Sequence, residues 1–564
     1  MLRRPTSLHG SRSALSVVSL LPPACAGRAV RLSCRTAMRT LLLVLFAALP
    51  LAAQLTEDQI RAGSADNWVT YGGDYASWRH SPLTQINTGN VHKLVPAWVR
   101  QIPDANRLET TPLVYEGVMY VTNTNEVYAL DARNGKVIWH FAADWVKRQS
   151  QNRGVALWGD RVYFITSDCH LVALNRFNGA VIWDKEFASW EKEGYWSSLA
   201  PLAVKGKILV GTAGGGSGQR GFVAALSADT GEEVWRFWTV PAEGDPGSET
   251  WGGFPAKWSG APTWTTGSYD SQLNTIYWPT GNPWPDFYGG RRRGDNLYSD
   301  SVVALDADTG KLKWHFQFTP HDEWDWDANE TMVLVDREFK GQMRKLLYHA
   351  DRNGFYYVLD RETGKFLMGR PFINELNWAS GLDEVSGRPL EIPDKRPTAG
   401  GNRICPSVRG ASNWMSPSYH PETGLFYVVT LEKCDIYTSS AQEPVPSTGF
   451  RGTGGEQVPA EPGTFYLRAL QPNTGELAWE YEMPGPAVMW AGTVSTMGGL
   501  IFSGDDDGHL VALDAKTGKD LWHFQMGTDI YASPITYAVD GKQYVMIATA
   551  TDLFAFALFE EAGR

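Results

Sequence analysis

The chain has 564 residues, 43% hydrophobic and 20% charged, a composition typical of a globular protein. The net charge is −11, but the first 53 residues hold seven Arg and no Lys or acid, which leaves 44 basic against 62 acidic residues in the remainder. The resulting −18 over residues 54–564 argues against nucleic acid or an anionic membrane as a partner, because both favour basic proteins.

Residues 1–53 have the features of a leader. The apolar run LLLVLFAALPLAA at 41–53 follows the basic start Met38-Arg39-Thr40 and ends in small residues, which predicts a signal peptide with its true start at Met38. The run is too short to span a bilayer, and no later segment is long and apolar enough for a membrane helix. We therefore expect an exported, periplasmic or otherwise secreted protein with one soluble domain at 54–564.

A strand–turn–strand repeat recurs along this domain. An apolar strand leads into a polar turn ending in Gly, and an aromatic position follows four residues later; YALDARNGKVIW and VALDADTGKLKW are examples. Counting one degenerate copy, NVHKLVPAW, and one copy with Met in place of Trp, the eight copies end at Trp98, Trp139, Trp183, Trp235, Trp314, Met368, Trp479 and Trp522.

This repeat predicts the fold class. Alternating apolar residues indicate strands, and Gly supplies the positive φ of a hairpin turn. Four strands in each of eight copies of roughly 64 residues predict an all-β, eight-bladed β-propeller. The recurring Trp side chains are interpreted as structural residues that dock neighbouring units, and a strand around 544–550 is expected to pair with the N-terminal segment and close the ring.

Three cysteines follow the leader, Cys169, Cys405 and Cys434. An odd number in an exported protein predicts one disulfide and one buried thiol. Cys405 and Cys434 lie in one loop-rich stretch, so we pair them and expect Cys169 in the core. The chain has no C-x-x-C-H motif for covalent haem, so any electrons that it collects must leave to a separate partner.

The spacing of the repeat widens where long loops are inserted. Successive turn glycines are 44 residues apart at 135–179, but 79 apart at 231–310 and 111 apart at 364–475. Inserted loops on a propeller face build functional sites. Three polar motifs fall in or beside these insertions: TGNPWPD (280–286), PHDEWDWDANE (320–330) and HADRNGFYY (349–357).

The motif PHDEWDWDANE crowds five acids into eleven residues. In an extended chain Asp325 and Asp327 share one face, and carboxylate oxygens suit Ca²⁺ or another hard cation. The alternative is an acidic surface loop, although Trp324 and Trp326 between the acids argue against simple solvation.

In this order, the Trp repeat, TGNP, PHDEWD and DRNG resemble the pyrroloquinoline-quinone (PQQ) dependent alcohol and methanol dehydrogenases over essentially the whole mature chain. The resemblance implies that Asp325 is the catalytic base, that Arg352 hydrogen-bonds the quinone oxygen and that Asn282 binds the metal. Asp327 resembles the additional carboxylate of the lanthanide-dependent branch, so the implied cofactors are PQQ and Ca²⁺ or a lanthanide ion. The remaining implied cofactor-binding residues are Glu109, Arg153, Ser198, Trp264, Asn413 and Trp490. The family also has a structural disulfide matching Cys405 and Cys434.

The chain departs from the family pattern in two places. A Glu metal ligand is usual in G-A-E-x-G-x-R-G, but the stretch here reads GGGSGQRG and puts Gly216 at that position. The adjacent cysteines of the alcohol dehydrogenases are replaced by Lys147 and Arg148. The missing Glu removes an anionic ligand, for which Asp327 compensates only in part.

Several of these residues have a structural alternative. Asp325 and Asn282 also suit turns, Arg352 and Arg153 could form ordinary salt bridges, and Glu109 could be a solvated carboxylate. Trp264 could belong to the core, and GGGSG (214–218) is interpreted as a tight loop because it lacks the Lys of a phosphate loop.

The function that this pattern predicts is oxidation of an alcohol, with electrons passed to a separate acceptor such as a soluble cytochrome c. The alternatives are a PQQ-dependent aldose or polyol dehydrogenase and a non-catalytic propeller scaffold, which the absent metal Glu would favour.

Overall fold

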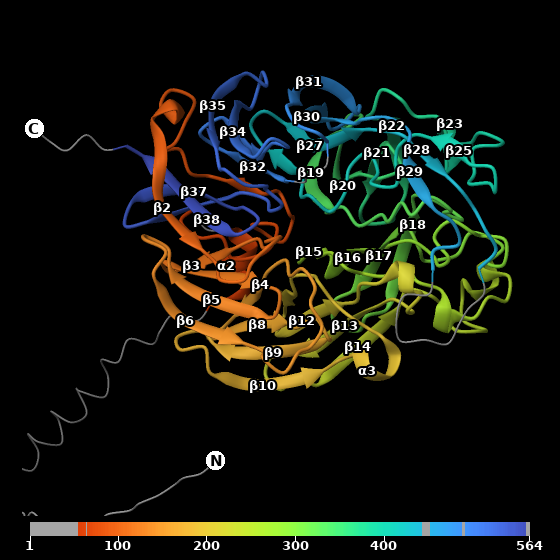
Figure 1. The fold of residues 1–564 in the computed structure, drawn as a ribbon, viewed down its shortest axis with the longest axis horizontal. Helices are drawn as coiled ribbons and strands as arrows, with labels where there is room; N and C mark the ends of the chain where they lie inside the picture. The colour runs from red at the N-terminus through yellow and green to blue at the C-terminus, as the bar shows by residue number, and fades with distance from the viewer. Residues whose placement is uncertain (1–54, 64, 443–451, 488–490, 560–564) are drawn as a thin grey trace, which may run out of the picture. The chain divides into compact units, whose positions relative to one another are not determined.

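The structure, a computed structural model, describes residues 55–63, 65–442, 452–487 and 491–559. The expected leader at 1–53 and Trp490 lie outside these residues. One compact unit begins at Leu55. Within the described residues it holds eight sheets of four or five strands, which follow one another in chain order around a ring (Figure 1). This arrangement confirms the predicted all-β propeller.

The first four sheets each consist of four consecutive antiparallel strands. Their strands are β3 (Leu113–Tyr115), β4 (Val118–Asn123), β5 (Glu126–Asp131) and β6 (Val137–Ala142); β7 (Ala156–Trp158), β8 (Arg161–Ile165), β9 (His170–Asn175) and β10 (Val181–Glu186); β11 (Leu202–Val204), β12 (Lys207–Gly211), β13 (Phe222–Ser227) and β14 (Glu233–Trp238); and β15 (Ser268–Asp270), β16 (Thr275–Pro279), β17 (Ser301–Asp306) and β18 (Leu312–Gln317).

Of the other four sheets, the first again consists of four consecutive strands, and the remaining three combine strands that are not consecutive in the chain. Their strands are β19 (Val333–Phe339), β20 (Gln342–Ala350), β21 (Phe355–Asp360) and β22 (Phe366–Pro371); β26 (Ser418–His420), β27 (Leu425–Glu432), β30 (Thr464–Gln471) and β31 (Glu476–Met483); β1 (His80–Ser81), β32 (Thr493–Thr496), β33 (Leu500–Gly504), β34 (His509–Asp514) and β35 (Asp520–Gln525); and β2 (Leu94–Gln101), β38 (Asp552–Leu558), β37 (Lys542–Ala548) and β36 (Ile535–Val539).

Smaller elements lie in the long insertions and at the start of the unit. Two small sheets contain β23 (Ala379–Leu382) with β24 (Pro389–Glu391), and β25 (Asn402–Ile404) with β28 (Asp435–Tyr437) and β29 (Gln457–Pro459). The helical segments are α2 (Glu57–Ala62), α3 (Trp190–Glu193), η1 (Val91–Lys93), η2 (Gly215–Ser217), η3 (Ser248–Trp251) and η4 (Ala256–Trp258). Among the described residues no helix has both the length and the apolar character needed to cross a membrane.

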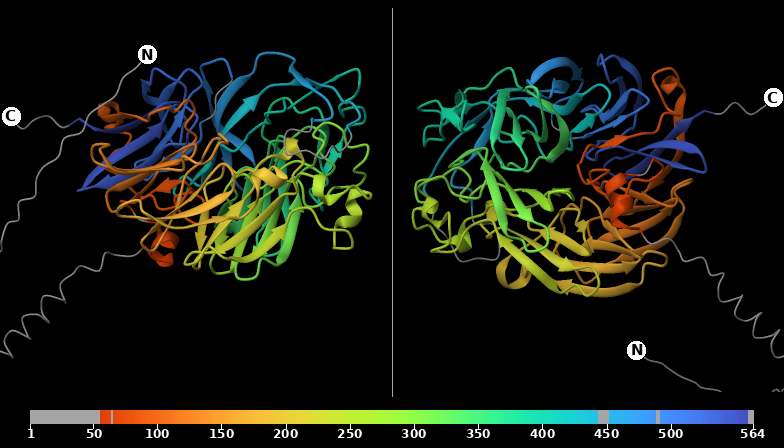
Figure 2. Two further views of the ribbon diagram at one scale, coloured as in Figure 1. Left: turned by 60° about the horizontal axis from the view of Figure 1, so that its bottom comes forward. Right: turned by 180° about the vertical axis from the view of Figure 1, so that it is seen from behind.

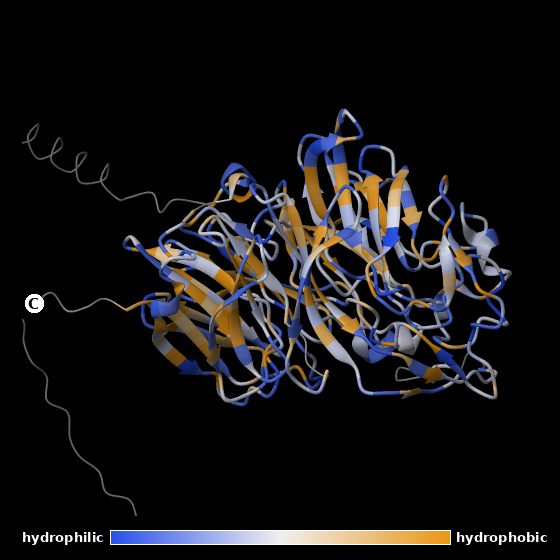
Figure 3. Cartoon of the chain, turned by 90° about the horizontal axis from the view of Figure 1, so that it is seen from above, coloured by the Kyte–Doolittle hydropathy of each residue, from blue (hydrophilic) through white to orange (hydrophobic). Residues whose placement is uncertain are grey.

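Burial changes across each sheet. The first strand is buried at every position in β3, β11, β15 and β26, whereas the outermost strands β6, β10 and β31 consist mainly of exposed and partly exposed residues. Apolar segments accordingly run along the strands, and the connecting loops are mainly hydrophilic (Figure 3). The inner strands are therefore covered on both faces, whereas the outer strands remain partly exposed.

The repeat tryptophans contact the turn of the following repeat. The indole N–H of Trp139 donates to the carbonyl of Arg176 at 2.9 Å. A Cβ added to Gly179, in that same turn, would lie 2.7 Å from the Trp139 ring, so the close approach requires glycine there. Equivalent N–H bonds run from Trp98, Trp235, Trp314 and Trp479 to Ala132, Ala307, Arg361 and Ala515.

The ring closes through β38, which pairs antiparallel with β2 (Figures 1 and 2). The expectation that residues 544–550 form this contact was wrong by one strand, because β37 occupies them and pairs with β36 and β38. Both segments are apolar strands of similar length, and their sequences alone do not tell them apart. Cys405 and Cys434 form the predicted disulfide, and Cys169 is a buried free thiol.

Candidate active site

Loops from several sheets enclose a cavity of about 400 Å³. Its walls come from the segments after β12 and β16, the segments before β7, β11 and β15, and the long connection between β18 and β19. It is lined by Gln151, Arg153, Trp196, Ser198, Ala213, Gly214, Gly215, Gly216, Ser217, Trp264, Asn282, Asp286, Asp325 and Asp327. Six of the residues predicted for cofactor or metal binding from distant motifs therefore line one cavity: Arg153, Ser198, Trp264, Asn282, Asp325 and Asp327.

Carboxylate and amide groups gather on one side of this cavity. The backbone N–H of Asn282 donates to Oδ1 of Asp327 at 2.8 Å, and its side-chain Nδ2 donates to Oδ1 of Asp286 at 2.9 Å. Asp325 has a positive φ of 63°, so the segment is not the extended chain expected from sequence. Asp325 and Asp327 nevertheless line the same cavity.

The carboxyl groups on this side are short of compensating positive charge. Burial raises the pKa of Asp325 well above its usual range, and the neighbouring Asp286 and Asp327 act in the same direction. Burial, together with the charge of Asp327, raises the pKa of Asp286 to about 8. A bound cation would reverse both effects by stabilising the ionised carboxylates.

Arg352 provides one positive charge behind these acids. It follows β20 in a turn, and its Nη1 donates to the backbone carbonyl of Asp325 at 2.9 Å. Its Nη2 donates to Oδ1 of Asn413 at 3.1 Å and lies 3.3 Å from Oδ2 of Asp327. Burial lowers the pKa of Arg352, but Asp327 and Asp325 outweigh this and raise it overall. Arg352 thus contacts the acids directly, and Asn413 contacts Arg352. Neither is among the residues that line the cavity.

A second buried charge pair supports another part of the wall, beside Trp264. Nη2 of Arg153 lies 2.6 Å from Oε2 of Glu109, and its Nη1 donates to the hydroxyl of Ser198 at 2.7 Å. The guanidinium of Arg153 also lies 4.9 Å from the ring centre of Trp264. Glu109 is 2% exposed, which excludes the solvated-carboxylate alternative, and it reaches the cavity through Arg153.

The glycine loop at 214–218 approaches Asn282 closely. A Cβ added to Gly215 would lie 2.1 Å from Oδ1 of Asn282, so a larger residue there would displace this amide. Gly216 lines the cavity and brings no carboxylate to it. At the other family departure, Arg148 stacks on Trp190 and Trp196 with its guanidinium 4.4 and 4.3 Å from their ring centres. Trp196 is itself a wall residue, so this change also lies next to the cavity.

Sequence reasoning missed one residue of the acidic side, Asp286. It is 3% exposed, and it is the last residue of the TGNPWPD motif that drew attention to Asn282. The signal was its position four residues after Asn282, because the loop folds back and brings the two side chains together.

A second cavity of about 390 Å³ adjoins the first. Asp286 and Asp325 line both, and the second is completed by Phe287, Val408, Thr453, Gly455, Glu456 and Gln457. Asp286 and Asp325 therefore lie where the two cavities meet.

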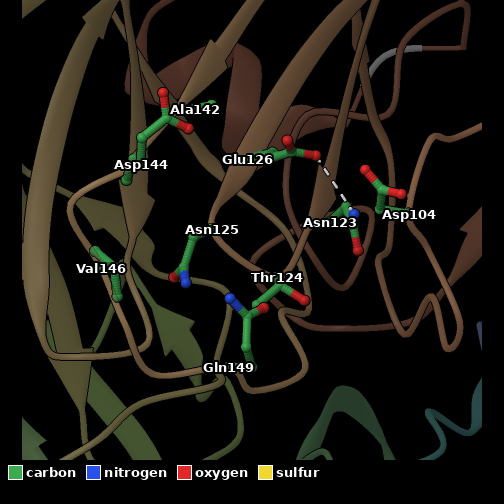
Figure 4. Close-up of a pocket in the computed structure, with 10 residues that line it drawn as sticks. Asp104, Asn123, Thr124, Asn125, Glu126, Ala142, Asp144, Val146 and Gln149 are labelled. Atoms are coloured by element: carbon green, nitrogen blue, oxygen red, sulfur yellow. Dashed lines mark hydrogen bonds between the residues drawn. The ribbon is translucent and has the colours of Figure 1, made fainter. Parts of the chain in front are cut away.

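A third cavity, of about 270 Å³, lies among the loops of the first sheet (Figure 4). Asn123 and Glu126 hydrogen-bond across it at 3.4 Å, and Glu126 also accepts from Tyr128. It shares no residue with the cavity beside Trp264 and contains none of the residues predicted for chemistry.

Comparisons with known proteins identify the family of the chain. Residues 68–371 and 483–545 match the family model described as the β-propeller domain of glucose, ethanol and alcohol dehydrogenases that use PQQ. The quinoprotein alcohol dehydrogenase PedH of Pseudomonas putida is 39% identical over 514 residues, 85% of each chain. The quinohemoprotein alcohol dehydrogenase of Comamonas testosteroni is 37% identical over 530 residues, 87% of this chain and 74% of that protein.

Among solved structures, a europium-containing methanol dehydrogenase superposes with a TM-score of 0.83 at 32% identity, covering 89% of this chain and 100% of that one. The chain therefore belongs to the PQQ-dependent quinoprotein alcohol dehydrogenase family and is an oxidoreductase of that type.

Proposed function

We propose that the protein oxidises an alcohol or a related hydroxyl compound with PQQ and a bound metal ion. The observation that carries this proposal is the single cavity in which Trp264, Arg153, Asn282, Asp325 and Asp327 meet. The aromatic wall of Trp264 and the guanidinium of Arg153 suit a planar quinone that carries carboxylates. The oxygen donors of Asn282, Asp325 and Asp327 suit a hard metal ion.

The residues fit a metal ion on physical grounds. Asp325 is half-buried, and desolvation together with Asp286 and Asp327 raises its pKa, so the ionised form needs a nearby positive charge beyond Arg352. Asn282, Asp325 and Asp327 would hold the ion, and Asp327 adds a carboxylate that favours a trivalent ion over Ca²⁺.

The residues also fit PQQ. Trp264 would lie against the flat face of the quinone, while Arg153 and Ser198 would bind its polar groups. Glu109 would orient Arg153, and Asn413, proposed for the same cofactor, would act through its hydrogen bond with Arg352. Trp490 is proposed for the same cofactor. When bound, PQQ accepts the electrons of the alcohol, and the metal ion polarises the quinone as a Lewis acid.

Asp325 is the proposed general base. Its carboxylate would accept the proton of the substrate hydroxyl, and its place between the two cavities lets it reach an alcohol in the second cavity beside a cofactor in the first. Arg352 fixes the backbone of Asp325 through the 2.9 Å bond to its carbonyl and would stabilise negative charge that develops at the quinone oxygen.

The architecture completes the proposal. Each of the eight sheets would be one blade of an eight-bladed propeller at 54–564, and the tryptophan contacts would dock each blade to the next. Residues 1–53 would direct export to the periplasm. A separate acceptor such as a soluble cytochrome c would take the electrons, since the sequence has no C-x-x-C-H motif.

The test is reconstitution of the purified protein with PQQ, once with Ca²⁺ and once with La³⁺. A bound-quinone absorption band that bleaches on addition of alcohol is expected, and Asp325→Asn should keep the band but lose turnover. D229N is the control, because Asp229 is a surface acid with its side chain 89% exposed. Normal turnover by D325N would exclude the proposed base. Bleaching by aldoses or polyols in preference to alcohols would move the activity to the alternative substrate class.

A further inference from the structure

The metal side of the cavity has a gap in its ligand set. Where the family places a carboxylate, the chain has Gly216, and the neighbouring Gly215 lets the amide of Asn282 approach the loop backbone. A cation bound among Asn282, Asp325 and Asp327 would receive two carboxylates from these residues, one fewer than with a Glu at 216. A trivalent ion gains more from each added anionic ligand than a divalent ion does.

Asp286 is positioned to fill this gap. It lies in the same loop as Asn282, four residues later, and its Oδ1 accepts a hydrogen bond from Nδ2 of Asn282 at 2.9 Å. The residue is 3% exposed and lines the cavity together with Asp325 and Asp327. A buried carboxylate that contacts one ligand and shares a wall with two others is within the reach of an ion bound there.

We propose that Asp286 supplies the carboxylate that Gly216 does not, so that the ion is bound by Asn282, Asp286, Asp325 and Asp327. This inference rests on the proposed metal-dependent function and names the residue set of its ion. Three carboxylates balance the charge of a trivalent ion, so the set favours a lanthanide. The carboxylate that is absent at position 216 would thus be supplied by Asp286, which lies in a different loop 70 residues further along the chain.

The experiment is a Eu³⁺ luminescence titration of the purified protein, with and without PQQ, for wild type and Asp286→Asn. The Asn variant keeps a group that can pair with Asn282 and removes only the charge. We expect at least a tenfold weaker affinity, and luminescence lifetimes in H₂O and D₂O should report one more water bound to the ion. D300N is the matched control, because Asp300 is a fully buried acid of the same region that does not line the cavity.

A complementation test makes the assignment specific. Gly216→Glu in the D286N background should restore the Eu³⁺ affinity and remove the additional water, because it returns the carboxylate to the family position. D286S is the second variant for the case in which D286N does not fold. Unchanged affinity and hydration in D286N would overturn the role of Asp286 while leaving the proposed function intact. Failure of the wild type to bind Eu³⁺ or Ca²⁺ would contradict the metal-dependent function itself.

Discussion

Nη2 of Arg352 lies 3.3 Å from Oδ2 of Asp327 in a part of the molecule where both side chains are at most 10% exposed. The same guanidinium donates to the backbone carbonyl of Asp325, so one arginine connects the proposed base to Asp327, a proposed metal ligand. Because the arginine is buried, its contacts are not replaced by water when they are lost.

Replacement of Arg352 by Lys should lower kcat by at least about 100-fold, because an ammonium group cannot bridge Asp325 and Asp327 in the way that a planar guanidinium does. Steady-state kinetics with PQQ and metal at saturation measure the effect. Arg337→Lys is the control, since Arg337 bonds Gly424 in another part of the fold. A kcat within twofold of the wild type would refute the bridging role.

Glu109→Gln should destabilise the protein by about 3 kcal/mol, because removing one partner leaves Arg153 buried without its compensating charge. It should also weaken PQQ binding, since Arg153 would lose its fixed orientation over Trp264. Urea unfolding and a cofactor titration measure the two effects. The exposed pair Arg370 and Glu476 provides the control, and E476Q should change the free energy of unfolding by less than about 0.5 kcal/mol.

The stability of the metal-free protein should fall as the pH rises. Burial raises the pKa of Asp286 from 3.8 to about 8, and burial raises that of Asp322 from 3.8 to about 7. The folded state therefore binds more protons than the unfolded chain, and the stabilisation is complete below about pH 4, declines above it and is absent above about pH 8.

Thermal unfolding of the metal-free protein between pH 5 and pH 9 measures this dependence, and D286N should flatten it. Asp295→Asn is the control, because hydrogen bonds from Arg388 lower the pKa of Asp295 and take its titration out of this range. An added lanthanide should bind more tightly as the pH rises, since it requires the ionised carboxylates. A melting temperature that rises with pH in the metal-free protein would contradict the assigned pKa directions.

The sequence predicted those features that depend on local pattern. Each turn glycine and the Trp four residues later identify a hairpin, and the repetition identifies the ring, so the all-β propeller and the disulfide were both predictable. The closing strand was misplaced because β37 and β38 are both apolar strands, and only the pairing of β38 with β2 distinguishes them.

The site was predictable through motifs rather than through spacing. Asp325 and Asp327 were expected on one face of an extended chain, yet Asp325 has a positive φ, and the two meet the cavity because the whole loop is folded around Trp324 and Trp326. Asp286 was missed because its relationship to Asn282 depends on how the loop turns back after Pro283. Contacts of this kind depend on loop conformation, which no periodic signal encodes.

The last prediction concerns the disulfide between Cys405 and Cys434, which closes a loop with a sequence separation of 29. For a loop of this length, the chain-entropy relation predicts that the free energy of unfolding of the double variant C405S/C434S is lower by about 3–4 kcal/mol. The bond ties β25 to β28, and β29 on the same small sheet carries Gln457 into the second cavity. Removal of the disulfide should therefore raise KM for the alcohol more than it weakens the binding of PQQ, because the cavity proposed for PQQ has no residue from this sheet. Cys169→Ser is the control, because that thiol is buried and unpaired. Equal weakening of alcohol and PQQ would show that the second cavity is not a separate substrate space.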